Sequence, residues 1–221
     1  MSCRSIPALL LLMSIPLAAQ APAAHTPASH APGSKTHSSD FGFSYSIPSD
    51  WEVVDSRATV PTVQQKVETE ATSEDEKKGA ACIRQALTAR HGTPASVMVV
   101  VALPFDCFGQ TMTEKDLSGF AAGASEGLKK TFDISNPVHG VYKMGSHHFW
   151  IERATGNLRG HPEVQYTVET VCGILKKGAV CWMDMSTDDA ALQVFEHGSV
   201  TLDGEAPTAL VPANAFDKKP S

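Results

Sequence analysis

Runs of apolar and alternating residues predict a series of strands along the chain. Residues 41–47 alternate strictly between large apolar and small side chains, which is typical of a strand with one buried face. The run 97–103 is apolar throughout and predicts a central strand that is covered on both faces. Further strands are predicted over 51–54, 81–90, 138–144, 146–154, 163–175, 178–186 and 199–203. Along 163–175, one predicted face is core (Tyr166, Val168, Cys172, Ile174) and the other is wetter (Gln165, Thr167, Glu169).

Three segments carry helical signals. The charged stretch 62–79 places apolar residues at helical spacing and predicts a mostly exposed helix. A second helix begins after Thr113, a suitable N-cap, and is expected to end at Asn136-Pro137; its apolar stripe is Leu117, Phe120, Ala121, Ala124, Leu128 and Phe132. A short third helix is expected from Asp188 to about His197, where Asp188 and Asp189 are interpreted as capping residues. The order of elements predicts an α+β fold in which helices flank an antiparallel sheet.

The stretch from Phe41 to Trp51 resembles the opening hairpin of PsbP-like α/β/α sandwich proteins, in which an aromatic strand leads into a Pro-x-x-Trp turn. The later elements are compatible with that fold over 41–203. The chain also resembles an uncharacterised family of exported bacterial proteins through Cys107-Phe-Gly and the stretch 176–182, Lys-Lys-Gly-Ala-Val-Cys-Trp. PsbP-like domains serve as accessory, assembly or binding modules, so the resemblance implies a non-catalytic role. It carries over no functional residue.

Composition divides the chain into four parts. Residues 1–21 have a weakly basic start, a short apolar run and small residues, the pattern of a signal peptide, with cleavage expected after Ala19 or Ala23. Residues 22–40 are rich in Ala, Pro, His and Ser and predict a disordered linker. A single domain is expected over 41–204, followed by an irregular tail over 205–221. These features predict an exported protein, periplasmic or secreted, without a membrane span in its mature form.

The charge balance narrows the range of partners. The chain has 18 Lys and Arg against 24 Asp and Glu, and loss of Arg4 with the leader changes 18 to 17, so the net charge moves from −6 to about −7. A mildly acidic chain without a basic stripe is a poor ligand for nucleic acid or anionic lipid. A protein or cell-envelope partner is therefore expected.

Four cysteines remain after processing, namely Cys82, Cys107, Cys172 and Cys181. They allow three connectivities in an oxidising compartment. We favour Cys82–Cys107, at the open end of a hairpin, and Cys172–Cys181, which face each other if Lys176-Lys177 is a two-residue loop. A three-residue loop with Gly178 in the left-handed conformation would instead send the two sulfurs to opposite faces. Four free thiols remain the alternative to disulfides.

Two patterns suggest catalysis. Gly123-Ala-Ser125-Glu-Gly127 matches the nucleophile-elbow motif, but that motif requires a strand-to-turn-to-helix junction and Ser125 is expected in mid-helix. The glycines at 119, 123 and 127 are instead expected to allow close packing of the helix. A metal site could form only if His139, His148, His161, Glu163 and Glu169 converged across strands, because none has local ligand spacing. No cofactor is expected.

Two functions remain open at this stage. We favour an exported accessory or binding module of unknown ligand that performs no catalysis. The alternative is a secreted hydrolase that uses Ser125 or a histidine-based metal site. If two of Trp51, Trp150 and Trp182 were exposed together, they would mark a partner surface.

Overall fold

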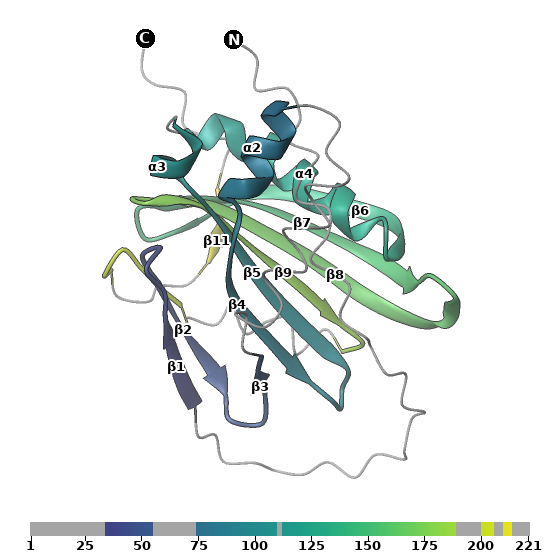
Figure 1. The fold of residues 1–221 in the computed structure, drawn as a ribbon. Helices are drawn as coiled ribbons and strands as arrows, with labels where there is room; N and C mark the ends of the chain where they lie inside the picture. Colours follow the sequence, from purple (N-terminus) through teal and green to yellow (C-terminus); the bar gives the residue numbers. More distant parts are fainter. Residues whose placement is uncertain (1–33, 55–73, 110–111, 189–199, 206–209, 214–221) are drawn as a thin grey trace.

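The computed structural model describes residues 34–54, 74–109, 112–188, 200–205 and 210–213. An eight-stranded antiparallel sheet has the order β11-β6-β7-β8-β9-β5-β4-β3, and a three-stranded sheet has the order β1-β2-β10 (Figure 1). The described strands are β1 (Ser34–Ser38), β2 (Phe43–Pro48), β3 (Glu52–Val53), β4 (Arg84–His91), β5 (Ser96–Pro104), β6 (Phe132–Met144), β7 (His147–Leu158), β8 (His161–Leu175), β9 (Gly178–Ser186), β10 (Val200–Leu202) and β11 (Val211–Pro212). The helical segments are α2 (Glu74–Cys82), α3 (Phe105–Phe108), η3 (Glu114–Asp116) and α4 (Leu117–Leu128).

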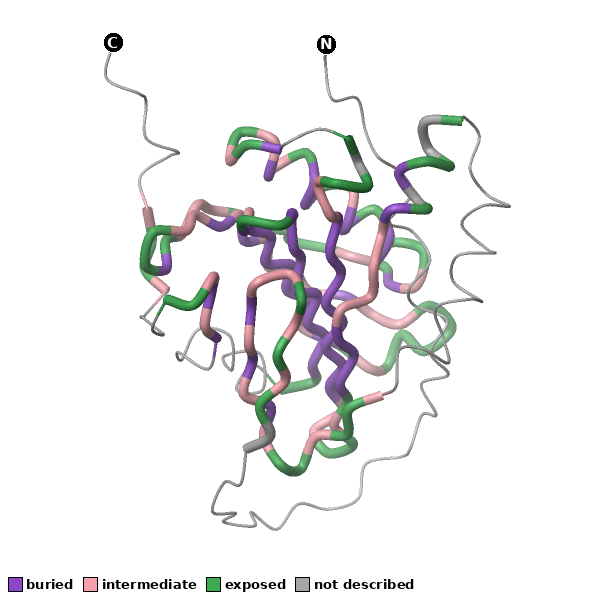
Figure 2. Tube along the Cα trace, turned by 60° about the vertical axis from the view of Figure 1, so that its left-hand side comes forward, coloured by how far each residue is buried: buried purple, intermediate pink, exposed green. Residues whose placement is uncertain are grey.

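The large sheet separates two apolar cores. On one face, α4 places Leu117, Phe120 and Leu128 against the sheet and lies over β7, β8 and β9. On the opposite face, β2 and β10 bury Phe43, Tyr45 and Leu202 against the other side chains of the same central strands. The backbone of these central strands is the most deeply buried part of the molecule (Figure 2). The uninterrupted apolar run of β5 is therefore explained by a core on each side.

The predicted α+β class with an antiparallel sheet is confirmed, but the predicted α/β/α layering is only partly present. Among the described residues, the helices lie on one face and the small sheet β1-β2-β10 covers the other (Figure 1). The fold is thus richer in strands than the sequence pattern indicated. Residues 189–197 of the predicted third helix and residues 62–73 of the predicted first helix lie outside the described residues.

The second helix ends earlier than predicted. It stops at Leu128, and β6 begins at Phe132 and runs through Asn136-Pro137. Asn136 adopts a φ of 53° at a β-bulge between Ser135 and Val138. Phe132 fits the helical stripe in sequence, yet it packs edge-on against Tyr166 of β8, with ring centroids 5.5 Å apart. The bulge interrupts the pairing of β6 with β7 at Asn136-Pro137, where proline has no N–H to donate.

Two short strands lie in segments that were expected to be irregular. β1 falls within the predicted linker 22–40 and pairs with β2. Its residues, Ser-Lys-Thr-His-Ser, have no apolar alternation, and a bond between His37 Nε2 and the Ala86 carbonyl (3.1 Å) attaches it to β4. β11 lies in the predicted tail and pairs with β6 at Tyr142 and Lys143. Pairing to a neighbouring strand, which local sequence does not encode, orders both segments.

No helix in the described ranges combines the length and the apolar character needed to cross a membrane.

Candidate functional site

The sheet face that packs against β2 and β10 changes from apolar to polar between adjacent rows of side chains. One row across the strands is Ile151, Val171, Trp182 and Val100, and all four are buried. The next row is Arg153, Glu169, Asp184 and Met98, and the row after that is Ser135, Thr155, Thr167, Ser186 and Ser96. We call Arg153, Glu169, Asp184 and the five hydroxyl residues the polar end of the sheet.

Two carboxyl groups lie side by side in the buried part of the polar end. Glu169 on β8 is directly opposite Asp184 on β9, and the two residues are 0% and 6% exposed. Arg153 on β7 is opposite Glu169 on its other side; its Nε donates to Glu169 Oε2 at 2.8 Å, and its Nη2 lies 2.5 Å from the same oxygen. Burial raises the pKa of the Asp184 carboxyl well above its usual range, and the negative charge of Glu169 raises it further.

The hydroxyl row runs from the buried centre of the sheet to its exposed edge. Ser96 and Ser186 are buried and their Oγ atoms lie 2.6 Å apart. At the other end, the hydroxyls of Ser135 and Thr155 are 2.9 Å apart in an exposed position. Thr167 lies between these two pairs in the register. The row therefore offers hydrogen-bonding groups that are shielded at one end and reachable by a partner at the other.

These polar groups extend onto a protruding part of the sheet. β9 ends at Ser186, opposite Thr167, whereas β8 begins six residues earlier, at His161, and pairs there with β7. Strands β6, β7 and β8, which we call the arm, consequently project beyond the end of β9 (Figure 1). On the side of the arm that faces the helices, the side chains are apolar and buried, for example Tyr166 and Val168. The opposite side of these three strands, from the row of Arg153 outward, is called the arm face here; it consists of Ser135, Val138, Arg153, Thr155, Gln165 and Thr167, and none of these is fully buried. Gln165 lies beyond the end of β9, and the other five lie level with its last residues.

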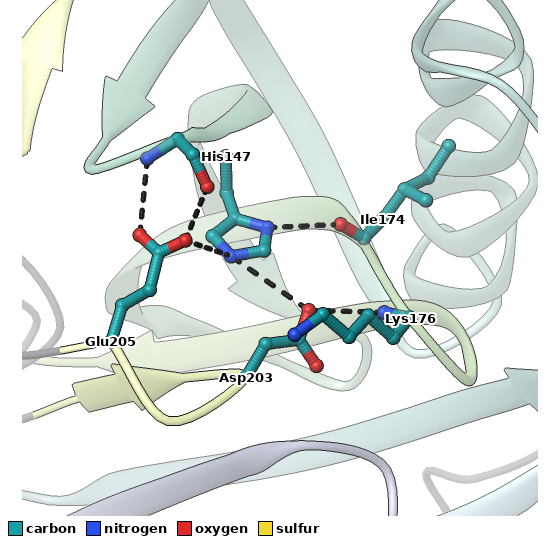
Figure 3. Close-up of polar contacts among 6 residues, drawn as sticks. His147, Ile174, Lys176, Asp203 and Glu205 are labelled. Carbon is teal, nitrogen blue, oxygen red and sulfur yellow. Dashed lines mark hydrogen bonds and ion pairs between the residues drawn. The ribbon is translucent and has the colours of Figure 1, made fainter.

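A second polar cluster surrounds His147 at the other end of the sheet (Figure 3). Its Nδ1 lies 3.4 Å from the Ile174 carbonyl, and its Nε2 lies 3.7 Å from Asp203 Oδ2 and 3.6 Å from Glu205 Oε1. Asp203 Oδ2 also accepts a hydrogen bond from the Lys176 backbone N–H at 3.0 Å. The cluster thus joins β7, the β8–β9 turn and the segment after β10.

The His147 cluster has the geometry of a structural link. Both ring nitrogens face protein acceptors, and the nearby Ser146 hydroxyl donates to Glu205 and not to the imidazole. Hydrogen bonds from the Ser146 side chain and backbone lower the pKa of Glu205. The His147 side chain is 12% exposed and lies among acceptors of its own chain, whereas the polar end reaches an exposed surface at Ser135 and Thr155. We therefore treat the polar end, and not the His147 cluster, as the candidate functional site.

The structure places Ser125 in the middle of α4, 5% exposed, without the strand and strained turn of a nucleophile elbow. The helix is continuous on both sides of it, since the Ser125 carbonyl accepts from Lys129 N at 3.2 Å. The expected role of the glycines in close packing does not hold for Gly119, which is exposed and has no atom within 4 Å of an added Cβ. Gly127, by contrast, is buried.

The residues of the hypothetical metal set do not meet. His147 and His148 point to opposite faces, as adjacent strand residues do, and His148 Nδ1 lies 2.7 Å from Glu114 Oε1 on the helix side. His139 stacks on Trp150, while His161 and Glu163 contact each other near the β7–β8 turn. Glu169 lies on the opposite face from His148, in the polar end. Within the described ranges, no three His, Cys, Asp or Glu side chains are placed to hold a metal ion.

The four cysteines form the two favoured disulfides, Cys82–Cys107 and Cys172–Cys181. Leu175 pairs with Gly178, so Lys176-Lys177 is a two-residue loop and the three-residue alternative is not adopted. Gly178 does not have a positive φ. It starts β9 so close to β5 that a Cβ would lie 2.6 Å from the Leu103 carbonyl oxygen.

The tryptophans do not form an exposed pair. Trp182 is fully buried, Trp51 stacks on His91, and Trp150 packs against the helix-side core. The sequence pattern did not predict the buried carboxyl pair, because the alternation along 163–175 assigns Glu169 to the wetter face of its strand. A signal was present in β9, where Asp184 interrupts the run Cys-Trp-Met-Asp-Met of a predicted central strand. A charged residue in a doubly covered strand requires a partner or a proton.

Comparison with known proteins gives a likeness of fold. No family model and no curated protein matches the chain. The solution structure of cyanobacterial PsbP from Synechocystis sp. PCC 6803 is similar to it, with 12% sequence identity, a TM-score of 0.41, and coverage of 81% of this chain and 98% of that one. This similarity agrees with the weak resemblance to PsbP-like domains that the opening hairpin indicated, and no residue role is transferred from it.

Proposed function

We propose that this chain is an exported, disulfide-stabilised binding module that performs no catalysis and contacts a protein or cell-envelope partner through the arm face. The observation that carries the proposal is the asymmetry of the arm. One side is buried under α4, whereas the other side, on the same strands, is polar and at least partly exposed. A sheet face that projects from the core without an apolar cover suits contact with another macromolecule.

Val138 and Arg153 form the centre of this proposed contact surface. They are directly opposite each other on β6 and β7, and Val138 is 71% exposed, more than any other large hydrophobic residue among those described. The Arg153 side chain is 43% exposed, and its guanidinium is fixed by Glu169. An arginine that a buried carboxylate holds in place, next to an exposed aliphatic side chain, resembles the composition of interface cores.

Export is supported by the leader-like pattern at 1–21 and by the two disulfides, which persist in oxidising compartments. Sequencing the N-terminus of the protein from the exported fraction tests this part. We expect the mature chain to start after Ala19 or Ala23. Recovery of the protein inside the cell with its leader intact would contradict it.

The binding part is tested by capturing partners from the exported fraction on the immobilised domain, in parallel for the wild type, Val138→Arg and Val53→Arg. Val53 on β3 is a matched control, because it is also an exposed valine on a strand, at 42% exposure, but lies away from the arm. We expect a component that the wild type and Val53→Arg retain and that Val138→Arg loses. Equal capture by all three forms, or no specific capture, would count against the arm face.

A further inference from the structure

Glu169 and Asp184 are two neighbouring acids, and the cation beside them is the guanidinium of Arg153. Antiparallel strands bring directly opposed Cβ atoms to within about 4.5–5.5 Å of each other. Both residues are almost completely buried, so water screens their repulsion poorly. Within the described part of the chain, Arg153 is the cation beside the pair, and its Nε and Nη2 both contact Glu169. Glu169 is thereby stabilised as the carboxylate, and Asp184 is left as the group that is easier to protonate.

We propose that Glu169 and Asp184 form a proton-sharing carboxyl pair, and that this pair makes the polar end of the sheet a pH-sensitive element. With one proton and Arg153, the group of three side chains is close to electroneutral. Loss of the proton adds a second buried negative charge next to the first, which favours opening of the strands that hold it. The proposal is independent of the binding function, because its consequence is measured on the domain without any partner.

The surroundings of Asp184 supply no second cation in the described residues. β5 places Met98 opposite it, and β8 places Glu169 opposite it on the other side. One row further, β4 places His91 opposite Ser96; the Nε2 of this histidine faces Asp50 at 3.1 Å. Asp188, which follows the end of β9, is another acid. Across the registers of β5 and β8, Asp184 therefore faces no cation directly, and Arg153 contacts its neighbour Glu169.

The sign of the pH effect follows from proton uptake. In the unfolded chain Asp184 has an ordinary pKa of about 4. The folded state keeps this proton up to a higher pH. Between the pKa of Asp184 in the unfolded chain and its raised pKa in the folded chain, the folded state therefore binds more protons than the unfolded state. The contribution of Asp184 to stability is consequently largest at acid pH and falls as the pH rises through that window.

Urea unfolding of the wild type, Asp184→Asn and Asp133→Asn between pH 4.5 and 8 tests the proposal. Asparagine has the shape of a protonated aspartate. At pH 8, Asp184→Asn should therefore unfold at a higher urea midpoint than the wild type. Its urea midpoint should also decrease less than that of the wild type as the pH rises. Asp133, an exposed aspartate on β6 whose carboxylate faces Arg159, is the matched control and should leave the pH profile unchanged. Identical profiles for all three proteins would overturn the proposal.

A measurement on the unmodified protein covers the case in which Asp184→Asn does not fold. The carboxyl-carbon NMR signal of Asp184 should titrate at clearly higher pH than that of Asp133 in the same sample. Titration of both signals near pH 4, the ordinary range for aspartate, would show that the pair does not hold a proton.

Discussion

Cys172 on β8 lies directly opposite Cys181 on β9, with their Cα atoms 4.1 Å apart and both side chains fully buried. This is the spacing of the closer type of antiparallel pair, in which side chains approach most nearly. The second disulfide has a different environment. It joins Cys82 at the end of α2 to Cys107 in α3, and Cys107 is exposed.

This difference predicts the order in which the disulfides are reduced. A thiol reductant must reach a sulfur to attack it, so Cys82–Cys107 should react first in the folded protein. Native reduction with a small dithiol, alkylation of the released thiols and mass spectrometry measure the order. We expect Cys82 and Cys107 to be labelled while Cys172 and Cys181 stay protected. In denaturant both pairs should be labelled, and labelling of Cys172 before Cys107 in the folded protein would contradict the prediction.

Two glycine substitutions should change stability in opposite directions. Gly178→Ala places a Cβ 2.6 Å from the backbone oxygen of Leu103, where β9 and β5 cannot separate without breaking their ladder, and should destabilise the protein by about 1–3 kcal/mol. Gly119→Ala adds a methyl group in open space on α4 and should stabilise it by up to about 1 kcal/mol. Urea unfolding measures both. Equal effects of the two substitutions would show that the approach of β9 to β5 is not close.

Asp203 should contribute to stability through both its carboxylate and its backbone conformation. Its side chain is 4% exposed and accepts from Lys176 N, and its φ is 48°. Asp203→Ala leaves the Lys176 N–H without this acceptor and disfavours the left-handed backbone, so we expect a loss of roughly 1–3 kcal/mol. Asp203→Asn keeps an acceptor oxygen and tolerates that backbone, and it should cost less. The prediction fails if alanine and asparagine are equally tolerated in thermal unfolding.

Ser125 should not react with a fluorophosphonate probe. Its hydroxyl is buried in mid-helix, so the probe cannot approach it in the geometry that nucleophilic attack requires. We expect the wild type to remain unlabelled, as Ser125→Ala does. Labelling of the wild type that disappears in Ser125→Ala would revive the hydrolase alternative.

The sequence by itself determined the strands whose signals are local. The apolar run of β5 and the alternation in β2 were predicted correctly, because each residue's face follows from the two-residue period of a strand. The capping residues of the helix that begins after Thr113 were also visible, and Thr113 and Asp116 bond as a capping box. The favoured cysteine pairing depended on a two-residue loop, which the β8–β9 register contains.

Only the tertiary structure decided which residues of different segments lie opposite each other. Phe132 fitted a helical stripe, but packing against Tyr166 places it in a strand. β1 has no apolar pattern and is ordered by pairing with β2. The alternation of β8 assigns Glu169 to a wet face, but Glu169 is fully buried between Arg153 and Asp184. The carboxyl pair arises from the register of β8 against β9. Contacts between residues distant in sequence depend on register and layering, which periodicity within a segment does not specify.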